Sequence, residues 1–144
     1  SPAGMGAAGV FAVELFLARD GRVLVNEAAP RPHNSGHWTQ EACVTSQFEQ
    51  YYRILAGLPL GSPELLRPAM MMNILGAPGA SGPVRYQGLE KALAVPGVDV
   101  HIYGKREVRP FRKMGHLTAL GSSSGEAESR AIAARALIRA TAGE

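Results

Sequence analysis

Apolar and polar positions over the first thirty residues predict a β-hairpin. Two apolar runs, 10–18 and 22–28, flank the sequence Arg19-Asp20-Gly21. Asp-Gly between two β-prone runs is a strong signal for a tight hairpin turn, with Asp20 and Gly21 as its two central residues. The register that follows pairs Arg19 with Arg22, Phe16 with Val25, and Glu14 with Glu27.

The pattern after the hairpin predicts a loop and then a helix. Residues 30–36 hold two prolines and a glycine, which is typical of irregular structure. Apolar residues at helical spacing over 38–56 predict an amphipathic helix that ends before Gly57 and Pro59. The segment 58–68 is rich in proline and glycine and marks a boundary between lobes. We therefore expect two domains, at 1–62 and 63–144.

The second lobe is predicted to be rich in strands. Residues 70–75 form an apolar run, 98–103 alternate as a half-buried strand does, and 109–120 form a last strand element. Residues 76–82 are predicted to be a loop and 88–94 a short helix. A C-terminal helix, with an N-cap among Ser122–Ser124 and Glu126 in its first turn, is predicted to run to Ala142. The predicted fold class is α/β (α+β).

Composition narrows the class of protein only moderately. With 144 residues, 46% hydrophobic and 19% charged, the chain suits a soluble protein with a buried core. Its single cysteine, Cys43, excludes an internal disulfide framework and fits a reducing, cytoplasmic location. No apolar run approaches the roughly 20 residues of a membrane span. The net charge of +3 suits an anionic substrate without requiring one. Residues 1–6 are predicted to be a flexible lead-in.

The predicted hairpin places two carboxylates opposite each other. Directly opposed residues on one sheet face have Cβ atoms about 5 Å apart, and like charges there destabilise the sheet. Glu14 and Glu27 would therefore gain from a cation between them, and oxygen ligands of this kind suit magnesium. Asn26 offers one further oxygen. A solvent-facing pair of glutamates remains the alternative, since a different turn would move Glu27 to the other face.

The loop after the hairpin concentrates polar side chains between residues of fixed backbone. Arg31 is a fork-shaped donor suited to planar oxyanions such as carboxylate, phosphate or bicarbonate. His33 and His37 have the spacing of a zinc pair only in a helix, which Pro32 and Gly36 disfavour. Histidines that form ordinary hydrogen bonds within a loop are the other interpretation.

A basic stretch follows in the second lobe. Lysine, arginine and histidine recur over twelve residues, and Pro110 and Gly115 within the stretch favour a shaped anion site. A solvated face is the alternative. Nucleic-acid binding would need aromatic platforms, and only 6% of the chain is aromatic. The basic residues are Lys105, Arg106, Arg109, Arg112, Lys113 and His116.

Two motifs, in the same order along the chain, carry a resemblance to a known family. The run 25–39, VNEAAPRPHNSGHWT, and the run 103–116, YGKREVRPFRKMGH, resemble the signatures of 5-(carboxyamino)imidazole ribonucleotide synthase, an ATP-grasp enzyme. The similarity covers about residues 9–120. The resemblance implies the C-terminal half of an ATP-grasp domain, followed by a small β-rich lobe.

The family resemblance also implies a reaction and a set of site residues. Such enzymes use ATP and Mg²⁺ to activate bicarbonate as carboxyphosphate, and they carboxylate 5-aminoimidazole ribonucleotide. By matching positions, Glu14 and Glu27 would bind the metal, and Asn26 and Glu27 would touch the nucleotide. Bicarbonate and its activated form would be held by Arg31, His33 and Asn34, and the substrate phosphate by Lys105, Arg112 and Lys113.

Other features of the resemblance leave alternatives open. The spacing between Lys105 and Arg109 is one residue longer than in the family motif, so either Lys105 or Arg106 reaches the phosphate. Another ATP-grasp carboxylase or ligase would share the two glutamates but not the sequence His33–His37. A non-catalytic basic binding or dimerisation module is the alternative from a different class.

We expect a cytoplasmic homodimer without nucleic-acid or membrane partners. Because the upstream half of the fold lies outside this sequence, we expect the chain alone to be inactive.

Overall fold

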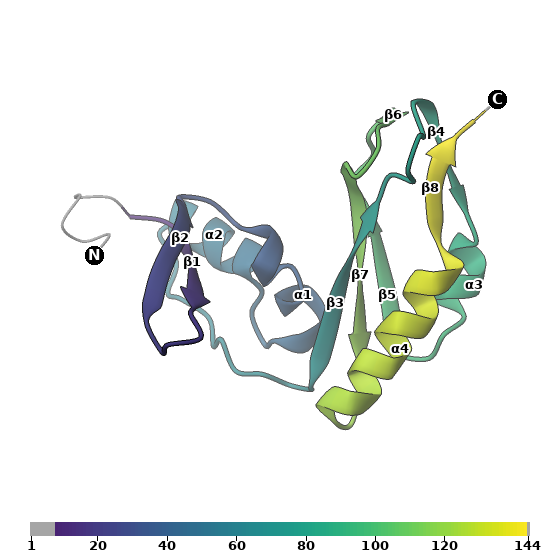
Figure 1. Ribbon diagram of the computed structural model, residues 1–144. Coiled ribbons are helices and arrows are strands. Elements are labelled where there is room, and N and C mark those ends of the chain that lie inside the picture. The colour runs from purple at the N-terminus through teal and green to yellow at the C-terminus, as the bar shows by residue number, and fades with distance from the viewer. Residues whose placement is uncertain (1–7, 144) are drawn as a thin grey trace. The chain divides into compact units, whose positions relative to one another are not determined.

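The computed structural model describes residues 8–143 and divides the chain into two units, 1–66 and 67–144 (Figure 1). The predicted lead-in, residues 1–6, lies outside the described residues. Within residues 8–143, no helix is long and apolar enough to cross a membrane. Each unit is described by itself below.

The first unit begins with the predicted hairpin. Strands β1 (Ala12–Leu17) and β2 (Val23–Ala29) pair antiparallel. The amide of Gly21 donates to the carbonyl of Ala18 at 2.9 Å, and Gly21 has φ +83°. This is a three-residue loop that ends in a left-handed glycine, and the predicted two-residue turn was therefore wrong.

The longer turn changes the register near it, and a β-bulge then restores the register. Beside the turn, Phe16 pairs with Leu24 and Leu15 with Val25, so the predicted pairing of Phe16 with Val25 was wrong. The register shifts between Leu15 and Glu14, where β2 carries an extra residue. Beyond this bulge Glu14 pairs with Glu27, as predicted.

The helix predicted over 38–56 is broken into two helices. Helix α1 spans Thr39–Ala42 and helix α2 spans Gln47–Leu55. Cys43 between them has extended backbone and forms a β-bridge with Leu65, which interrupts the helix. Ser46 is the N-cap of helix α2, because its hydroxyl accepts a hydrogen bond from the amide of Glu49 at 3.1 Å.

The second unit contains two small antiparallel sheets. The first has the order β3–β7–β5, from β3 (Ala69–Leu75), β7 (Lys113–Leu120) and β5 (Val98–Ile102). The second has the order β6–β4–β8, from β6 (Glu107–Val108), β4 (Gly82–Gln87) and β8 (Arg139–Ala142). The predicted strands at 70–75 and 98–103 are confirmed, whereas β4 and β8 were not predicted.

Helices α3 (Leu89–Leu93) and α4 (Ser124–Leu137) complete this unit. Helix α4 packs along β3 and β7 (Figure 1). Its buried alanines allow the helix to approach the sheet closely. Ser123 is its N-cap, as predicted, but the helix ends at Leu137 and the predicted extension to Ala142 was wrong. The core between these elements contains Ile74, Val108, Met114, Leu117, Ala131, Ala134 and Ile138.

Candidate functional site

The carboxylates of the first unit meet on one face of the hairpin. Glu14 and Glu27 are direct partners, and the extra residue of the bulge is Asn26, next to Glu27. The Asn26 amide donates a hydrogen bond to Glu14 Oε2 at 3.1 Å. The bulge therefore brings the side chain of Asn26 to the carboxylate pair, where regular alternation would have turned it to the opposite face.

His33 lies against this pair and is only 7% exposed. Its Nε2 lies 3.0 Å from Glu27 Oε1, and its Nδ1 lies 3.4 Å from Glu14 Oε1. The Ser35 amide donates to Nδ1 at 3.4 Å, and the Ser35 hydroxyl lies 2.8 Å from the same nitrogen. With Nδ1 as an acceptor, Nε2 is the nitrogen that donates a hydrogen bond to Glu27, so the histidine fixes the direction of this carboxylate.

The arrangement has the chemistry of a site for a divalent cation. Ligand atoms of Glu14, Glu27 and His33 all lie within 4.8 Å of one another. The side chains of Glu14 and Glu27 are 35% and 55% exposed, so water and a substrate phosphate have access to the same oxygens. Magnesium typically takes one or two carboxylates and completes its shell in this way. The residues present therefore fit this metal.

Two other predicted residues of the loop differ in their surroundings. Arg31 is exposed, and its guanidinium donates to the carbonyl of Pro32 at 3.0 Å. Asn34 begins a short 3-10 turn, Asn34–Gly36, for which His33 is the N-cap. His33 therefore contacts the carboxylate pair directly, whereas the side chain of Arg31 is exposed to solvent.

Sequence reasoning missed Gln47, the first residue of α2. Its side-chain oxygen accepts from the amide of His33 at 2.8 Å, and its side-chain nitrogen donates to the carbonyl of His33 at 2.8 Å. The same nitrogen lies 2.8 Å from His37 Nδ1. A glutamine at a helix start carries no signal of such contacts, because they connect residues 14 and 10 positions apart.

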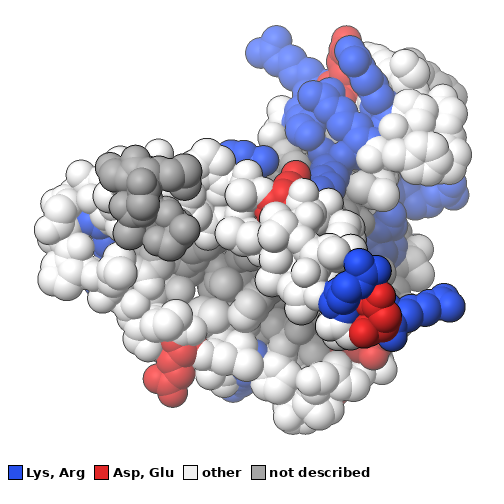
Figure 2. Space-filling model, turned by 60° about the vertical axis from the view of Figure 1, so that its left-hand side comes forward, with Lys and Arg blue, Asp and Glu red and all other residues white. Residues whose placement is uncertain are grey.

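The basic residues of the second unit gather around the start of β7. Lys105 is half-buried, and its ammonium donates to the carbonyl of Lys113. Burial, and then the charges of Arg112 and Lys113, lower the pKa of Lys105 below its ordinary value. Arg112 donates to the carbonyl of Glu107 at 3.1 Å. Figure 2 shows lysine and arginine side chains gathered at the upper right of the view, with few acidic side chains among them.

A tyrosine and two histidines line the sheet beside this basic cluster. His101 on β5 and His116 on β7 are cross-strand partners whose rings stack with centroids 4.6 Å apart. The Tyr103 hydroxyl lies 2.9 Å from His116 Nδ1, and the ammonium of Lys105 lies 5.6 Å from the centre of the Tyr103 ring. The Tyr103 ring thus connects Lys105 to the two stacked histidines.

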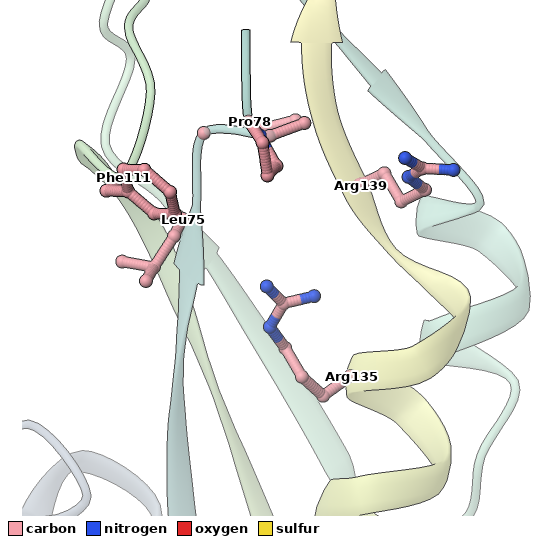
Figure 3. Close-up of a pocket in the computed structure, with 8 residues that line it drawn as sticks. Leu75, Pro78, Phe111, Arg135 and Arg139 are labelled. Carbon is pink, nitrogen blue, oxygen red and sulfur yellow. The ribbon is translucent and has the colours of Figure 1, made fainter. Parts of the chain in front are cut away.

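A pocket of about 200 Å³ lies elsewhere in the second unit, between the 75–78 segment and β8 (Figure 3). Arg135 points into it, whereas the side chain of Arg139 turns away. The Arg135 Nε donates to the carbonyl of Asn73 at 2.9 Å, and its Nη1 to the carbonyl of Ile138 at 3.0 Å. This arginine joins the end of α4 to β3, and we assign it a structural role.

Comparisons with known proteins cover both units of the chain. Residues 3–48 match the ATP-grasp domain model, and residues 69–130 match the phosphoribosylaminoimidazole carboxylase C-terminal domain model. A phosphoribosylaminoimidazole carboxylase of Vigna aconitifolia, described as chloroplastic, is 53% identical over 84% of this chain. The crystal structure of N5-carboxyaminoimidazole ribonucleotide synthetase from Thermotoga maritima matches 99% of this chain with a TM-score of 0.90 and 49% identity.

The chain belongs to the N5-carboxyaminoimidazole ribonucleotide synthase family. It spans 22% of the Vigna relative and 40% of the Thermotoga chain, so it corresponds to a part of these proteins. A family structure from Aspergillus clavatus, described as a complex with ADP and 5-aminoimidazole ribonucleotide, matches 85% of this chain and 33% of its own with a TM-score of 0.73 and 40% identity. The expected fold, half of an ATP-grasp domain followed by a small β-rich lobe, is confirmed.

Proposed function

We propose that this chain is the C-terminal part of an ATP-dependent ligase that carboxylates 5-aminoimidazole ribonucleotide with bicarbonate, through carboxyphosphate, in purine synthesis. The observation that carries the proposal is the pairing of Glu14 with Glu27 beside His33, in a chain of this family. The Aspergillus relative, described in complex with ADP and the aminoimidazole nucleotide, supports the substrate assignment.

Glu14 and Glu27 would hold magnesium on the phosphates of ATP, with Asn26 and Glu27 beside the nucleotide. When bound, the metal would neutralise charge on the phosphates during transfer to bicarbonate. The carboxylates contribute by position: they face each other across a paired sheet, so little reorganisation is needed when the cation arrives.

Arg31, His33 and Asn34 would hold bicarbonate and carboxyphosphate. Arg31 is exposed at the loop and can turn its planar guanidinium to an oxyanion. His33 couples this loop to the metal ligands, because its Nε2 donates to Glu27. Carboxyphosphate hydrolyses readily in water, and a loop with a fixed backbone helps to exclude water from it.

Lys105, Arg112 and Lys113 would bind the phosphate of the aminoimidazole nucleotide. Lys105 lies among these charges and contacts the Lys113 carbonyl, which favours it over Arg106 as the phosphate ligand. Burial, and then the charges of Arg112 and Lys113, lower the pKa of Lys105, and an incoming phosphate dianion would relieve the repulsion between these charges.

Several further features belong to the same proposal. Of the domains predicted from the sequence, 1–62 carries the proposed metal and bicarbonate groups, and 63–144 carries the proposed phosphate groups. A homodimer, a cytoplasmic location and a lack of nucleic-acid and membrane partners remain predictions from the sequence. Another ATP-grasp ligase and a non-catalytic basic module are the competing functions.

The test is isotope incorporation by the full-length protein that carries this chain. With ATP, magnesium, labelled bicarbonate and 5-aminoimidazole ribonucleotide, we expect labelled carboxylated nucleotide and one ADP for each product. ATP turnover with a different acceptor, and none with this nucleotide, would favour another ATP-grasp ligase. Binding of RNA with a steep salt dependence, without any turnover, would favour the basic module.

A further inference from the structure

We propose that Gln47 is a positioning residue for the metal ligands: it holds His33 so that the His33 ring orients Glu27. The inference rests on the proposed role of Glu27 in binding magnesium. It adds a residue that lies outside both sequence motifs and outside the set of predicted site residues.

The amide of Gln47 matches the backbone of His33 at both polar groups. Its oxygen accepts from the His33 N–H and its nitrogen donates to the His33 C=O, both at 2.8 Å. This pair of contacts fixes both the plane and the direction of the His33 backbone. It also fixes which end of the amide is oxygen, because only the oxygen can accept from an N–H.

Gln47 also anchors the C-terminal end of the loop, through Thr39 and Gly36. The backbone amide of Gln47 donates to Thr39 Oγ1 at 3.0 Å, and Thr39 Oγ1 donates to the carbonyl of Gly36 at 2.6 Å. A Cβ on Gly36 would lie 2.6 Å from Gln47 Oε1, so the backbone of the loop passes directly against the amide. The residues from His33 to Thr39 are therefore anchored at the start of α2.

The position of the His33 backbone affects Glu27 through the His33 side chain. The His33 ring is almost fully buried, and its Nε2 lies 3.0 Å from Glu27 Oε1. A displacement of about 1 Å in the His33 backbone would break a hydrogen bond of this length. Residues that orient a metal ligand from behind typically change metal affinity by about 10- to 100-fold when mutated.

The same helix supplies a matched control. Gln50 binds the backbone of Gly61 in the same two-point manner, with its nitrogen 2.7 Å from the carbonyl and its oxygen 3.0 Å from the amide. A role limited to joining a loop to α2 predicts similar effects for the two glutamines. A positioning role predicts that only Gln47 changes metal binding.

The experiment measures Mn²⁺ binding, by electron paramagnetic resonance in the presence of ADP, to the full-length protein. Variants Gln47→Leu, Gln47→Glu and Gln50→Leu are compared with wild type, and thermal unfolding is recorded for each. We expect Gln47→Leu to weaken Mn²⁺ binding about tenfold. Gln47→Glu keeps the acceptor for the His33 amide but places a carboxylate oxygen against the His33 carbonyl, so it should also weaken Mn²⁺ binding. The KM for the aminoimidazole nucleotide should stay unchanged in both.

Each result decides a specific point. Equal Mn²⁺ affinity in wild type, Gln47→Leu and Gln47→Glu would overturn the positioning role, and so would an equal loss in Gln50→Leu. If Gln47→Leu does not fold, the comparison of Gln47→Glu with Gln50→Leu decides in the same way. A wild-type protein that binds no Mn²⁺ with ADP would instead overturn the proposed metal role of Glu27, and the inference with it.

Discussion

Glu14 on β1 faces Glu27 on β2 because a bulge at Asn26 compensates for a three-residue turn. Without the extra residue, the register beside the turn would place Asn26 opposite Glu14. The bulge instead makes Glu27 the partner of Glu14 and keeps Asn26 close enough to donate to Glu14. The candidate metal site is thus built by an irregularity of the hairpin, as is common for bulges near functional sites.

His33 and Arg31 should differ in which ligand they affect. We expect His33→Gln to raise the half-saturating magnesium concentration about tenfold, because the contact of Nε2 with Glu27 is lost. We expect Arg31→Ala to raise the KM for bicarbonate and to leave the magnesium requirement unchanged. Steady-state kinetics of the full-length protein, with each ligand varied in turn, measure both. An unchanged magnesium requirement in His33→Gln would contradict the orienting role.

The lowered pKa of Lys105 predicts a pH dependence of substrate binding. Lys105 loses its proton at a lower pH than an ordinary lysine, because burial and the charges of Arg112 and Lys113 disfavour the ammonium. The affinity for the substrate phosphate should therefore fall as pH rises through this lowered pKa. We expect the KM for the aminoimidazole nucleotide to rise across the alkaline range in wild type.

The control for this pH dependence is Lys105→Arg, since a guanidinium keeps its charge throughout the range. Its KM should change little with pH, whatever its absolute value. Parallel KM–pH profiles for wild type and Lys105→Arg would show that another group causes the dependence.

Phe111 offers a test of backbone strain. It has φ +60° in the turn from Arg109 to Arg112, where Pro110 precedes it. A bulky residue in this conformation costs about 1–2 kcal/mol, and Phe111 is 68% exposed, so its ring regains little by burial. We expect Phe111→Gly to raise the free energy of unfolding by about 1 kcal/mol, once the higher chain entropy of glycine is subtracted.

Denaturant unfolding of the full-length protein measures this change. Phe111→Ala is the matched control, because it removes the ring but keeps the Cβ that causes the strain. The alanine variant should be no more stable than wild type. Equal gains in both variants would show that the ring, and not the left-handed backbone, destabilises the turn.

The sequence predicted elements whose signals are local and missed those set by distant contacts. The strand at Ala69–Leu75 and the cap at Ser123 follow from apolar runs and hydroxyl chemistry. Residues 139–142 are alanine, arginine and threonine, and they were predicted as helix. They form β8 because they pair with β4, which lies far away in the sequence; Tyr86 and Ala140 are partners in this pairing.

The candidate site shows the same division. The opposed glutamates were predicted, although the turn that was assumed for them was wrong, because the bulge restored their pairing. The family resemblance named His33, but its burial against Glu27 needed the folded loop. Gln47 could not be found from the sequence, because its contacts depend on how α2 packs against residues 33–37.

The most direct test of the central claim is ATP turnover by full-length Glu27→Gln, with magnesium, bicarbonate and 5-aminoimidazole ribonucleotide present. The change removes one carboxylate charge and keeps the size of the side chain. The account predicts the loss of magnesium-dependent ADP formation, while thermal unfolding stays close to that of wild type. Near-normal ADP formation in this variant would contradict the assignment of Glu14 and Glu27 as the metal ligands.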